Sequence, residues 1–256
     1  MILTKIAKKV TRLIEAIESP RLFTVWRRGI SVSGFLGLNR PWLLNANIKT
    51  VFDIGANTGQ FASLIHEVLP EAFIYSFEPL EECYQKLKTK EREITNFKAF
   101  NIALGDTDGE IEFYRNEYSP SSSILPMADL HKQNYPFTDK EYLSKVKVAR
   151  LDDIAKDLVI EGDLLIKMDV QGYEDKVIHG GRLLINRAKI LLIETSFNPL
   201  YLGQPLFGDI YECLRDDFNY MGSLYQSQTI SKIDGSILQE DSIFVRKPNI
   251  LVQKLT

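Results

Sequence analysis

Residues 51–60 read VFDIGANTGQ, and this stretch decides the fold that we expect for the chain. Its first four residues are typical of a short buried strand, and the apolar side chains of residues 61–69 recur at the spacing of a helix. A glycine-rich turn therefore joins a strand to a helix. The two glycines would let the turn tighten and approach a ligand closely, because glycine has no Cβ. We expect Asn57 or Thr58 to cap the helix.

Strand and helix patterns alternate along the rest of the chain. Alternation of this kind implies right-handed crossovers and a mostly parallel sheet with helices on both faces, which is an α/β fold. The Asp108-Gly109 pair predicts a hairpin turn, and residues 116–140 form the longest irregular stretch. Further strands are expected at 73–77, 97–104, 110–114, 145–150, 164–169, 190–194 and 242–245, and further helices at 80–90 and 207–217.

The composition is that of a soluble globular protein. The chain has 256 residues, of which 45% are hydrophobic and 25% charged, and a net charge of −3. These values exclude long disordered, collagen-like and disulfide-scaffold proteins. The two cysteines, Cys83 and Cys213, form no CxxC pair, which argues against a structural zinc site and favours a reducing cytoplasm. The small net charge gives no reason to expect a nucleic-acid partner.

The charge is divided unevenly along the chain. Residues 1–46 contain eight Lys or Arg and two Glu, a net charge of +6, which leaves −9 for residues 47–256. We therefore predict a basic helical extension (1–46) followed by one acidic domain (47–256) with a separate role. Residues 2–17 have the pattern of an amphipathic helix that ends before Pro20, and residues 27–37 read as a loose connection. The helix could pack on its own domain, form a homodimer, or lie at an anionic membrane surface.

Four of the expected strands end in a carboxylate. Ligands of parallel sheets bind beyond the carboxyl ends of the strands, so these acids favour a polar ligand site there. The turn at 55–59 is not the dinucleotide pattern GxGxxG, because Asn57 replaces the middle glycine, and an acid directly before the turn would repel a pyrophosphate. It suits a ligand that carries positive charge, although an ordinary strand–helix turn remains the alternative. The four acids are Asp53, Glu78, Asp169 and Glu194.

Glu78 ends the second expected strand, 25 residues after Asp53. A carboxylate at this place typically accepts hydrogen bonds from both hydroxyls of a ribose. Because Pro79 follows it, Glu78 could instead be a plain carboxylate at a helix entrance. Together with the glycine-rich turn, Glu78 predicts a cofactor that contains a nucleoside.

Seven motifs together resemble those of FkbM-type methyltransferases, which are S-adenosylmethionine-dependent enzymes of the Rossmann-like class. They occur in the family's order over roughly four fifths of the chain, and residues 1–46 lie outside the resemblance. The resemblance implies a class I methyltransferase fold with a mostly parallel, seven-stranded sheet. The motifs are VFDIGANTGQ (51–60), FEP (77–79), NIALG (101–105), SSS (121–123), LDD (151–153), KMDVQGYE (167–174) and DSIFVRK (241–247).

The resemblance also implies roles for single residues. Four residues of the turn would bind the methionine half of the cofactor: Asp53, Gly55, Asn57 and Gly59. Glu78 would hold the ribose hydroxyls, the backbone of Ala103 would lie beside the adenine, and Ser122 would lie in a loop over cofactor and acceptor. Asp169 would lie beside the reacting methyl group. Gln171 departs from the family, which often has Glu at this position.

The reaction implied is methyl transfer to a hydroxyl oxygen of a saccharide, a glycan or a secondary metabolite. Such an acceptor benefits from a base that takes its proton, and Asp169 is the first candidate by position, before Glu174, His179 and Glu194. Asp169 could instead bind the methionine ammonium or orient the acceptor. No His, Asp and Glu cluster has the spacing of metal ligands, so we expect no metal. Two other functions remain open: an NAD-dependent oxidoreductase, and a non-catalytic cofactor-binding module docked to a membrane or a partner.

Overall fold

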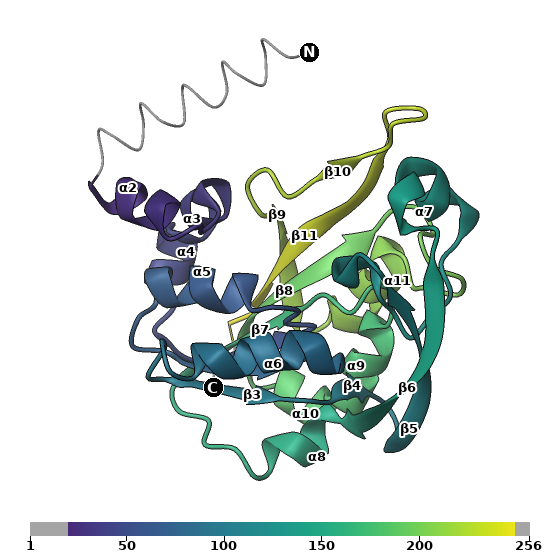
Figure 1. The fold of residues 1–256 in the computed structure, drawn as a ribbon. Helices are drawn as coiled ribbons and strands as arrows, with labels where there is room; N and C mark the ends of the chain where they lie inside the picture. The colour runs from purple at the N-terminus through teal and green to yellow at the C-terminus, as the bar shows by residue number, and fades with distance from the viewer. Residues whose placement is uncertain (1–19, 249–256) are drawn as a thin grey trace, which may run out of the picture.

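A central sheet runs through the protein, for which a computed structural model describes residues 20–248 (Figure 1). Five strands are parallel, in the order β3 (Phe97–Phe100), β2 (Phe73–Phe77), β1 (Ile48–Ile54), β7 (Asp163–Met168) and β8 (Ala188–Ser196). Beyond β8 lies the antiparallel β11 (Ile237–Arg246), which pairs with both β9 (Phe218–Ser223) and β10 (Thr229–Ile230). The mostly parallel α/β sheet is confirmed.

The central sheet has eight strands, one more than the seven that we expected. The physical reason is the length of β11, which has ten residues. Its second half, from Ser242, pairs with β9, and its first half pairs with the two-residue β10. The pattern of residues 242–245 predicts only the half that is buried in the sheet.

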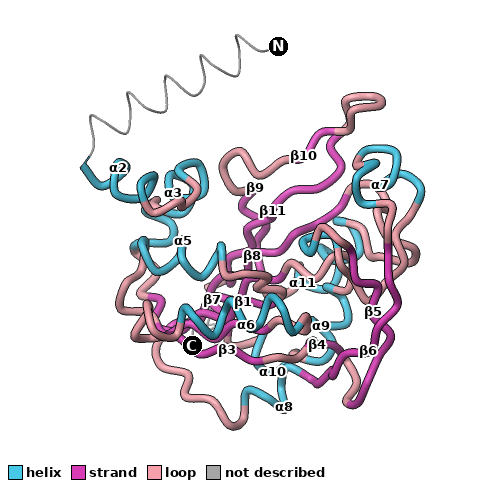
Figure 2. Tube along the Cα trace, in the orientation of Figure 1, coloured by secondary structure: helices cyan, strands magenta, loops and turns pink. Residues whose placement is uncertain are grey.

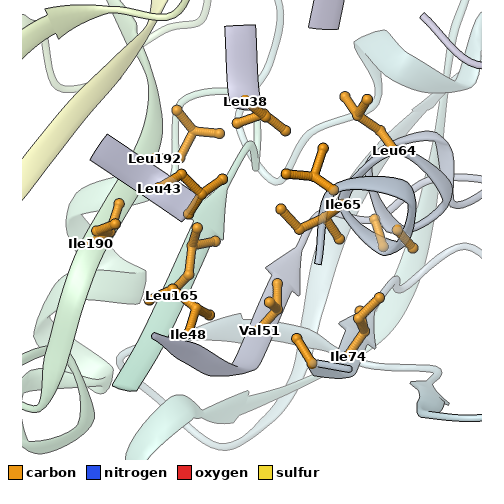
Figure 3. Close-up of a cluster of buried hydrophobic side chains, with 14 of the residues drawn as sticks. Leu38, Leu43, Ile48, Val51, Leu64, Ile65, Ile74, Leu165, Ile190 and Leu192 are labelled. Atoms are coloured by element: carbon orange, nitrogen blue, oxygen red, sulfur yellow. The ribbon is translucent and has the colours of Figure 1, made fainter. Parts of the chain in front are cut away.

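Helices cover both faces of the sheet, because neighbouring strand residues point to opposite sides. Val51 and Leu165 belong to one apolar core, whereas Phe52 and Ile166 belong to the other. Figure 3 shows the first core, in which Leu38 and Leu43 meet Ile65 over the strands. It lies under α2 (Pro20–Arg27), α3 (Val32–Leu38), α4 (Pro41–Leu44), α5 (Gln60–Val68) and α6 (Glu81–Lys90), and the second core lies under α8 (Leu151–Ala155), α9 (Glu174–Gly180), α10 (Arg182–Ile185) and α11 (Phe207–Leu214).

The segment that contains α2, α3 and α4 packs on the central sheet instead of forming the loose connection that we expected for residues 27–37. Gly34 and Gly37 lie inside α3, where a Cβ would come 2.7 Å from Leu64 and 3.0 Å from Leu224. The two glycines therefore permit close packing of a helix and do not mark a break. The amphipathic helix predicted for residues 2–17 lies outside the described residues. Between residues 20 and 248, no helix has both the length and the apolar character needed to cross a membrane.

A second sheet of three strands lies beside the first, at the right of Figure 2. Its order is β4 (Ala103–Gly105), β6 (Glu141–Arg150) and β5 (Gly109–Asn116), so the single strand expected at 97–104 is split between two sheets. The hairpin expected at Asp108-Gly109 is also wrong, because β6 lies between the two strands that this turn joins. The stretch 116–140 contains η1 (Ser119–Ser121), α7 (Asp129–Asn134) and η2 (Pro136–Thr138).

Candidate active site

The four predicted acids lie at one edge of the central sheet. Asp53 is the penultimate residue of β1, Glu78 and Asp169 directly follow β2 and β7, and Glu194 is near the end of β8. Asp53 pairs in register with Ser76 on one side and with Lys167 on the other. The parallel topology thus brings together residues that are far apart in the sequence.

Asp53 is fully buried and contacts Lys167, a residue that sequence reasoning did not select. The Lys167 Nζ atom lies 3.5 Å from Asp53 Oδ1 and 3.4 Å from Asp169 Oδ2, and Ser76 donates a hydrogen bond to Asp53. Burial raises the pKa of Asp53 and outweighs the opposing effect of Lys167. Burial alone would lower the pKa of Lys167, but the surrounding carboxylates, Asp169 first, raise it. Lys167 could have been selected from the sequence, because it is a lysine inside an otherwise apolar strand.

A cavity of about 630 Å³ opens at this edge. Much of its lining is apolar, with Phe77, Leu80, Ile102, Leu104 and Phe113 among the lining residues. Of the eight predicted site residues six line it: Gly55, Asn57, Glu78, Ala103, Ser122 and Asp169. The other two, Asp53 and Gly59, do not.

Glu78 lies in this cavity with only 5% of its surface exposed. Its two carboxylate oxygens accept hydrogen bonds from the backbone N–H groups of Asn57 (2.8 Å) and Leu80 (2.9 Å). Burial raises the pKa of Glu78 to about 7, against these two hydrogen bonds, which lower it. Each carboxylate oxygen can accept a further hydrogen bond. The geometry therefore fits a pair of ribose hydroxyls, and the apolar lining residues of the same cavity fit a planar base.

The glycines of the turn have different structural roles. Gly55 has φ +76°, and a Cβ there would lie 1.8 Å from the backbone oxygen of Asp169, so only glycine lets the turn reach the end of β7. Gly59 has φ +83°, and its Cα is covered by the side chain of Lys90, 2.6 Å from where a Cβ would be. Gly59 therefore makes room for a lysine, and it lines neither this cavity nor the larger cleft described below.

The predicted helix cap is wrong. The N-cap of α5 is Gly59, which offers no side chain, because Asn57 and Thr58 both precede it in the turn. Asn57 instead holds the turn and the covering loop together: its Oδ1 accepts the N–H of Thr58, and its Nδ2 donates to Ser119 Oγ at 3.1 Å. Ser122 completes this loop and accepts the N–H of Asn116.

Gln171 connects two of the acids. Its Nε2 atom donates to Asp169 Oδ1 (2.7 Å) and to Glu194 Oε2 (2.5 Å), while its Oε1 accepts the hydroxyl of Tyr201 (2.7 Å). Its φ of +57° is unusual for a residue with a side chain. Burial, followed by the charges of Asp169 and Asp241, raises the pKa of Glu194 well above its ordinary value. An amide can bridge two carboxylates, whereas a third carboxylate at this position would repel both.

A larger cleft of about 1670 Å³ meets the cavity at Gly55, Asn57, Pro120 and Asp169, which line both. Its walls come from the segment between α2 and α3, from the turn and α5, and from residues 224–227. Arg28, Lys90 and Lys167 supply positive charge, and Asp169 and Asp241 supply negative charge. Most other polar lining groups are hydroxyls and amides: Ser31, Ser33, Thr58, Gln60, Ser63, Gln226 and Ser227.

The remaining candidate bases lie outside both spaces. Glu174 is buried and accepts the N–H groups of Val170 and Gly172, so it organises the loop after β7. The His179 Nδ1 atom lies 2.7 Å from the backbone oxygen of Asp175, on its own helix. In the part of the chain that the structure describes, no group of three His, Cys, Asp or Glu residues could hold a metal ion.

Comparison with known proteins assigns the family. The Methyltransferase FkbM domain matches residues 53–221. The chain belongs to the FkbM methyltransferase family. This match covers every acid and glycine of the cavity, but it excludes α2, α3 and α4, and also β10 and β11.

Two curated relatives are methyltransferases by name. The chain is 29% identical over 169 residues to the 2-O-methyltransferase NoeI of Sinorhizobium fredii, which is 63% of this chain and 69% of NoeI. It is 26% identical over 153 residues to the methyltransferase sdnD of Sordaria araneosa, covering 51% of this chain and 59% of sdnD. The solved FkbM methyltransferase of Methylobacillus flagellatus aligns with 91% of this chain and 59% of its own, at 14% identity and a TM-score of 0.47.

Proposed function

We propose that this FkbM methyltransferase uses S-adenosylmethionine and transfers its methyl group to a hydroxyl oxygen. One observation carries the proposal. The cavity that contains Glu78 joins a larger cleft at Asp169, so a nucleoside cofactor and an acceptor can approach the same point from two sides. The name of NoeI, a 2-O-methyltransferase, supports oxygen as the acceptor atom.

The residues of the cavity fit the cofactor. Glu78 would accept the ribose hydroxyls, and apolar lining residues such as Ile102 and Phe113 would hold the adenine. Asn57 and Asp169, at the junction with the cleft, would lie along the methionine half. Asp53 would not contact the cofactor itself, because its buried carboxylate pairs with Lys167 and holds that side chain in place.

When bound, S-adenosylmethionine would supply a methyl group on a positively charged sulfur, and this sulfur would keep the electron pair of the S–C bond as the methyl group is transferred. The acceptor hydroxyl oxygen forms the new O–C bond and must lose its proton. Asp169 is the proposed proton acceptor, and its two oxygens are held by Gln171 and Lys167. Holding the acceptor in line with the methyl group can supply about 7–11 kcal/mol of the barrier reduction.

The larger cleft is the proposed acceptor site. Its hydroxyl and amide groups match an acceptor rich in hydroxyls, such as a saccharide, a glycan or a secondary metabolite. A cytoplasmic location remains a prediction based on the two cysteines, both of which are free thiols.

Calorimetric titration of S-adenosylhomocysteine tests the cofactor site. We expect binding by the wild-type chain and by Glu110→Gln, an exposed control on β5, and much weaker binding by Glu78→Ala. Equal binding by all three would contradict the site. The NAD-dependent alternative predicts the opposite preference, namely binding of NAD and none of S-adenosylhomocysteine.

Turnover is tested by incubating the protein with labelled S-adenosylmethionine and fractionated cell extract, and then identifying the labelled product. We expect label on an oxygen atom. Cofactor binding without label transfer to any fraction would favour the non-catalytic module.

A further inference from the structure

Helix α2 presents two aromatic side chains to solvent. Phe23 and Trp26 are 42% and 52% exposed, and their ring centroids lie 5.9 Å apart. Arg27 follows Trp26 and is exposed on the same side of the helix, one turn after Phe23. The opposite side holds Val25, which is fully buried in the first core. We call Phe23, Trp26 and Arg27 the aromatic–arginine face.

The charge around this face has one sign. Residues 20–46 contain four arginines and no carboxylate. Of these four arginines, which all lie in the part of the chain that the structure describes, only Arg28 forms an ion pair, with Glu67 of α5. Arg21 lies over the ring of Phe35 and donates to the backbone oxygen of Glu67, and Arg40 donates to the backbone oxygen of Leu36. Most of this positive charge is therefore available to an anionic partner.

We propose that the aromatic–arginine face docks the protein on the surface of an anionic lipid bilayer. Trp and Phe insert at the boundary between headgroups and acyl chains, and arginine binds lipid phosphates from the same side. Two aromatic side chains are too small a surface for a stable protein–protein interface, which buries about 800 Å² on each partner. The same small surface is sufficient for a bilayer when basic residues add their attraction.

The position of α2 connects docking with the larger cleft. The segment that leaves α2 lines this cleft through Arg28, Ser31 and Ser33. Figure 1 places α2 at an outer corner of the molecule, away from β5 and β6. Docking through α2 therefore brings this wall of the cleft near the lipid surface, within reach of an acceptor that is attached to a lipid.

Co-sedimentation of the full-length chain with vesicles tests the proposal. We expect binding to vesicles of phosphatidylglycerol and phosphatidylcholine, no binding to pure phosphatidylcholine, and weakening as salt shortens the range of the attraction. The double substitution Phe23→Ser/Trp26→Ser should weaken binding by at least about tenfold, since it removes most of the inserted apolar surface. Arg27→Gln should weaken it by roughly fivefold.

Phe137→Ser is the matched control, because Phe137 is 60% exposed but lies on η2, and it should bind vesicles like the wild type. Undiminished vesicle binding by the double variant would overturn the proposal and assign binding to residues 1–19. Equal binding to neutral vesicles would also overturn it. So would self-association that the double variant abolishes, because a second copy would then cover the face. Titration with S-adenosylhomocysteine reports separately on the cofactor site and on the integrity of each variant.

Discussion

At the scale of single residues, Glu78 should make the affinity of the proposed cofactor site depend on pH. Burial raises the pKa of Glu78 to about 7, so near neutrality part of the apo-protein carries a protonated Glu78. Ribose hydroxyls donate hydrogen bonds, and they bind better to the ionised carboxylate. We therefore expect binding of the proposed cofactor to be linked to loss of the proton from Glu78.

We predict that the affinity for S-adenosylhomocysteine rises between pH 6 and pH 8, by at most about tenfold per pH unit, with release of a proton. Calorimetry in buffers of different ionisation enthalpy measures both quantities. Glu78→Gln should bind more weakly and lose the pH dependence in this range. A pH dependence that survives in Glu78→Gln would assign the proton to another group.

Gln171 is expected to act as a positioning residue for Asp169. In Gln171→Leu the carboxylates of Asp169 and Glu194 lose their shared donor, and we predict that kcat falls by roughly a hundredfold through misplacement of Asp169. The affinity for S-adenosylhomocysteine should change little, and the pH profile of kcat should shift. Loss of affinity together with kcat would instead indicate a collapsed cavity.

The ion pair between Asp53 and Lys167 should stabilise the fold as a pair. Lys167→Met leaves the fully buried Asp53 without its cation, and we predict a loss of about 3–5 kcal/mol in the free energy of unfolding. The double variant Asp53→Asn/Lys167→Met should recover much of this loss, as urea unfolding would measure. Additive effects of the two substitutions would contradict a coupled pair.

For single residues, the sequence predicts the acids at the strand ends better than it predicts the residues that contact them. Asp53 and Glu78 follow from strand patterns, because the end of a buried strand fixes the edge at which a side chain lies. Tyr201 contacts Gln171 across 30 positions of sequence, and no periodic pattern encodes such a contact. Gly59 shows a second limit, since a glycine motif does not say whether a ligand or a lysine occupies the space.

Among the elements, α9 depends on a glycine that no motif marks. Gly180 ends this helix, and a Cβ there would lie 1.7 Å from the backbone oxygen of Gly105 in β4. This contact joins the helix layer to the second sheet, and Ala103 of the cavity lies on the same strand.

We predict that Gly180→Ala lowers the free energy of unfolding by about 1–3 kcal/mol, because two backbones must separate. Gly208→Ala is the control: Gly208 is exposed in α11 with open space around it, and alanine should stabilise that helix by roughly 0.5–1 kcal/mol. Chemical denaturation of both variants measures the difference. An unchanged free energy of unfolding in Gly180→Ala would show that β4 can move away from the helix without cost.

Element prediction succeeds where local period and burial agree. The patterns of β1, β7 and β8 predict these strands because both of their faces are covered. The strand expected at 97–104 is split because Asn101 donates to the backbone oxygens of Glu78 and Pro79 at the end of β3, and the chain then leaves for another sheet. An apolar run predicts extended backbone but not the sheet to which it belongs.

The whole molecule holds several acids whose protons are favoured by folding. Burial raises the pKa of Glu78 and Glu174 to about 7 and that of Asp241 to about 6, above the ordinary values of free carboxyl groups. The folded state thus binds more protons than the unfolded state between about pH 4 and pH 7. These groups stabilise the fold most at the lower end of that window and lose this contribution as the pH rises through it.

We predict that the apo-protein is less stable at pH 8 than at pH 5.5. Urea unfolding at the two values measures the change, and Glu174→Gln should reduce the slope. A stability that rises with pH across this range would mean that other titrating groups dominate.

The divided charge of the sequence corresponds to two layers of the structure. The acidic part builds the sheet edge, and the basic part supplies α2, α3 and α4 on one face. The fold class could be predicted because hydrophobic period is repeated over many strands. The sequence could not predict that residues 28–34 line a cleft, because this depends on how α3 packs against α5.

Two segments that lie far apart in the sequence, residues 28–34 and 224–227, each form part of the cleft wall. Residues 53–221 contain all the predicted cofactor residues, whereas Ser31, Ser33 and residues 224–227 belong to segments outside that range. A mutant library confined to these outer segments would vary the proposed acceptor side while leaving the proposed cofactor residues unchanged. Chimeras that exchange only the two ends between relatives should therefore inherit their choice of acceptor from the donor of the ends.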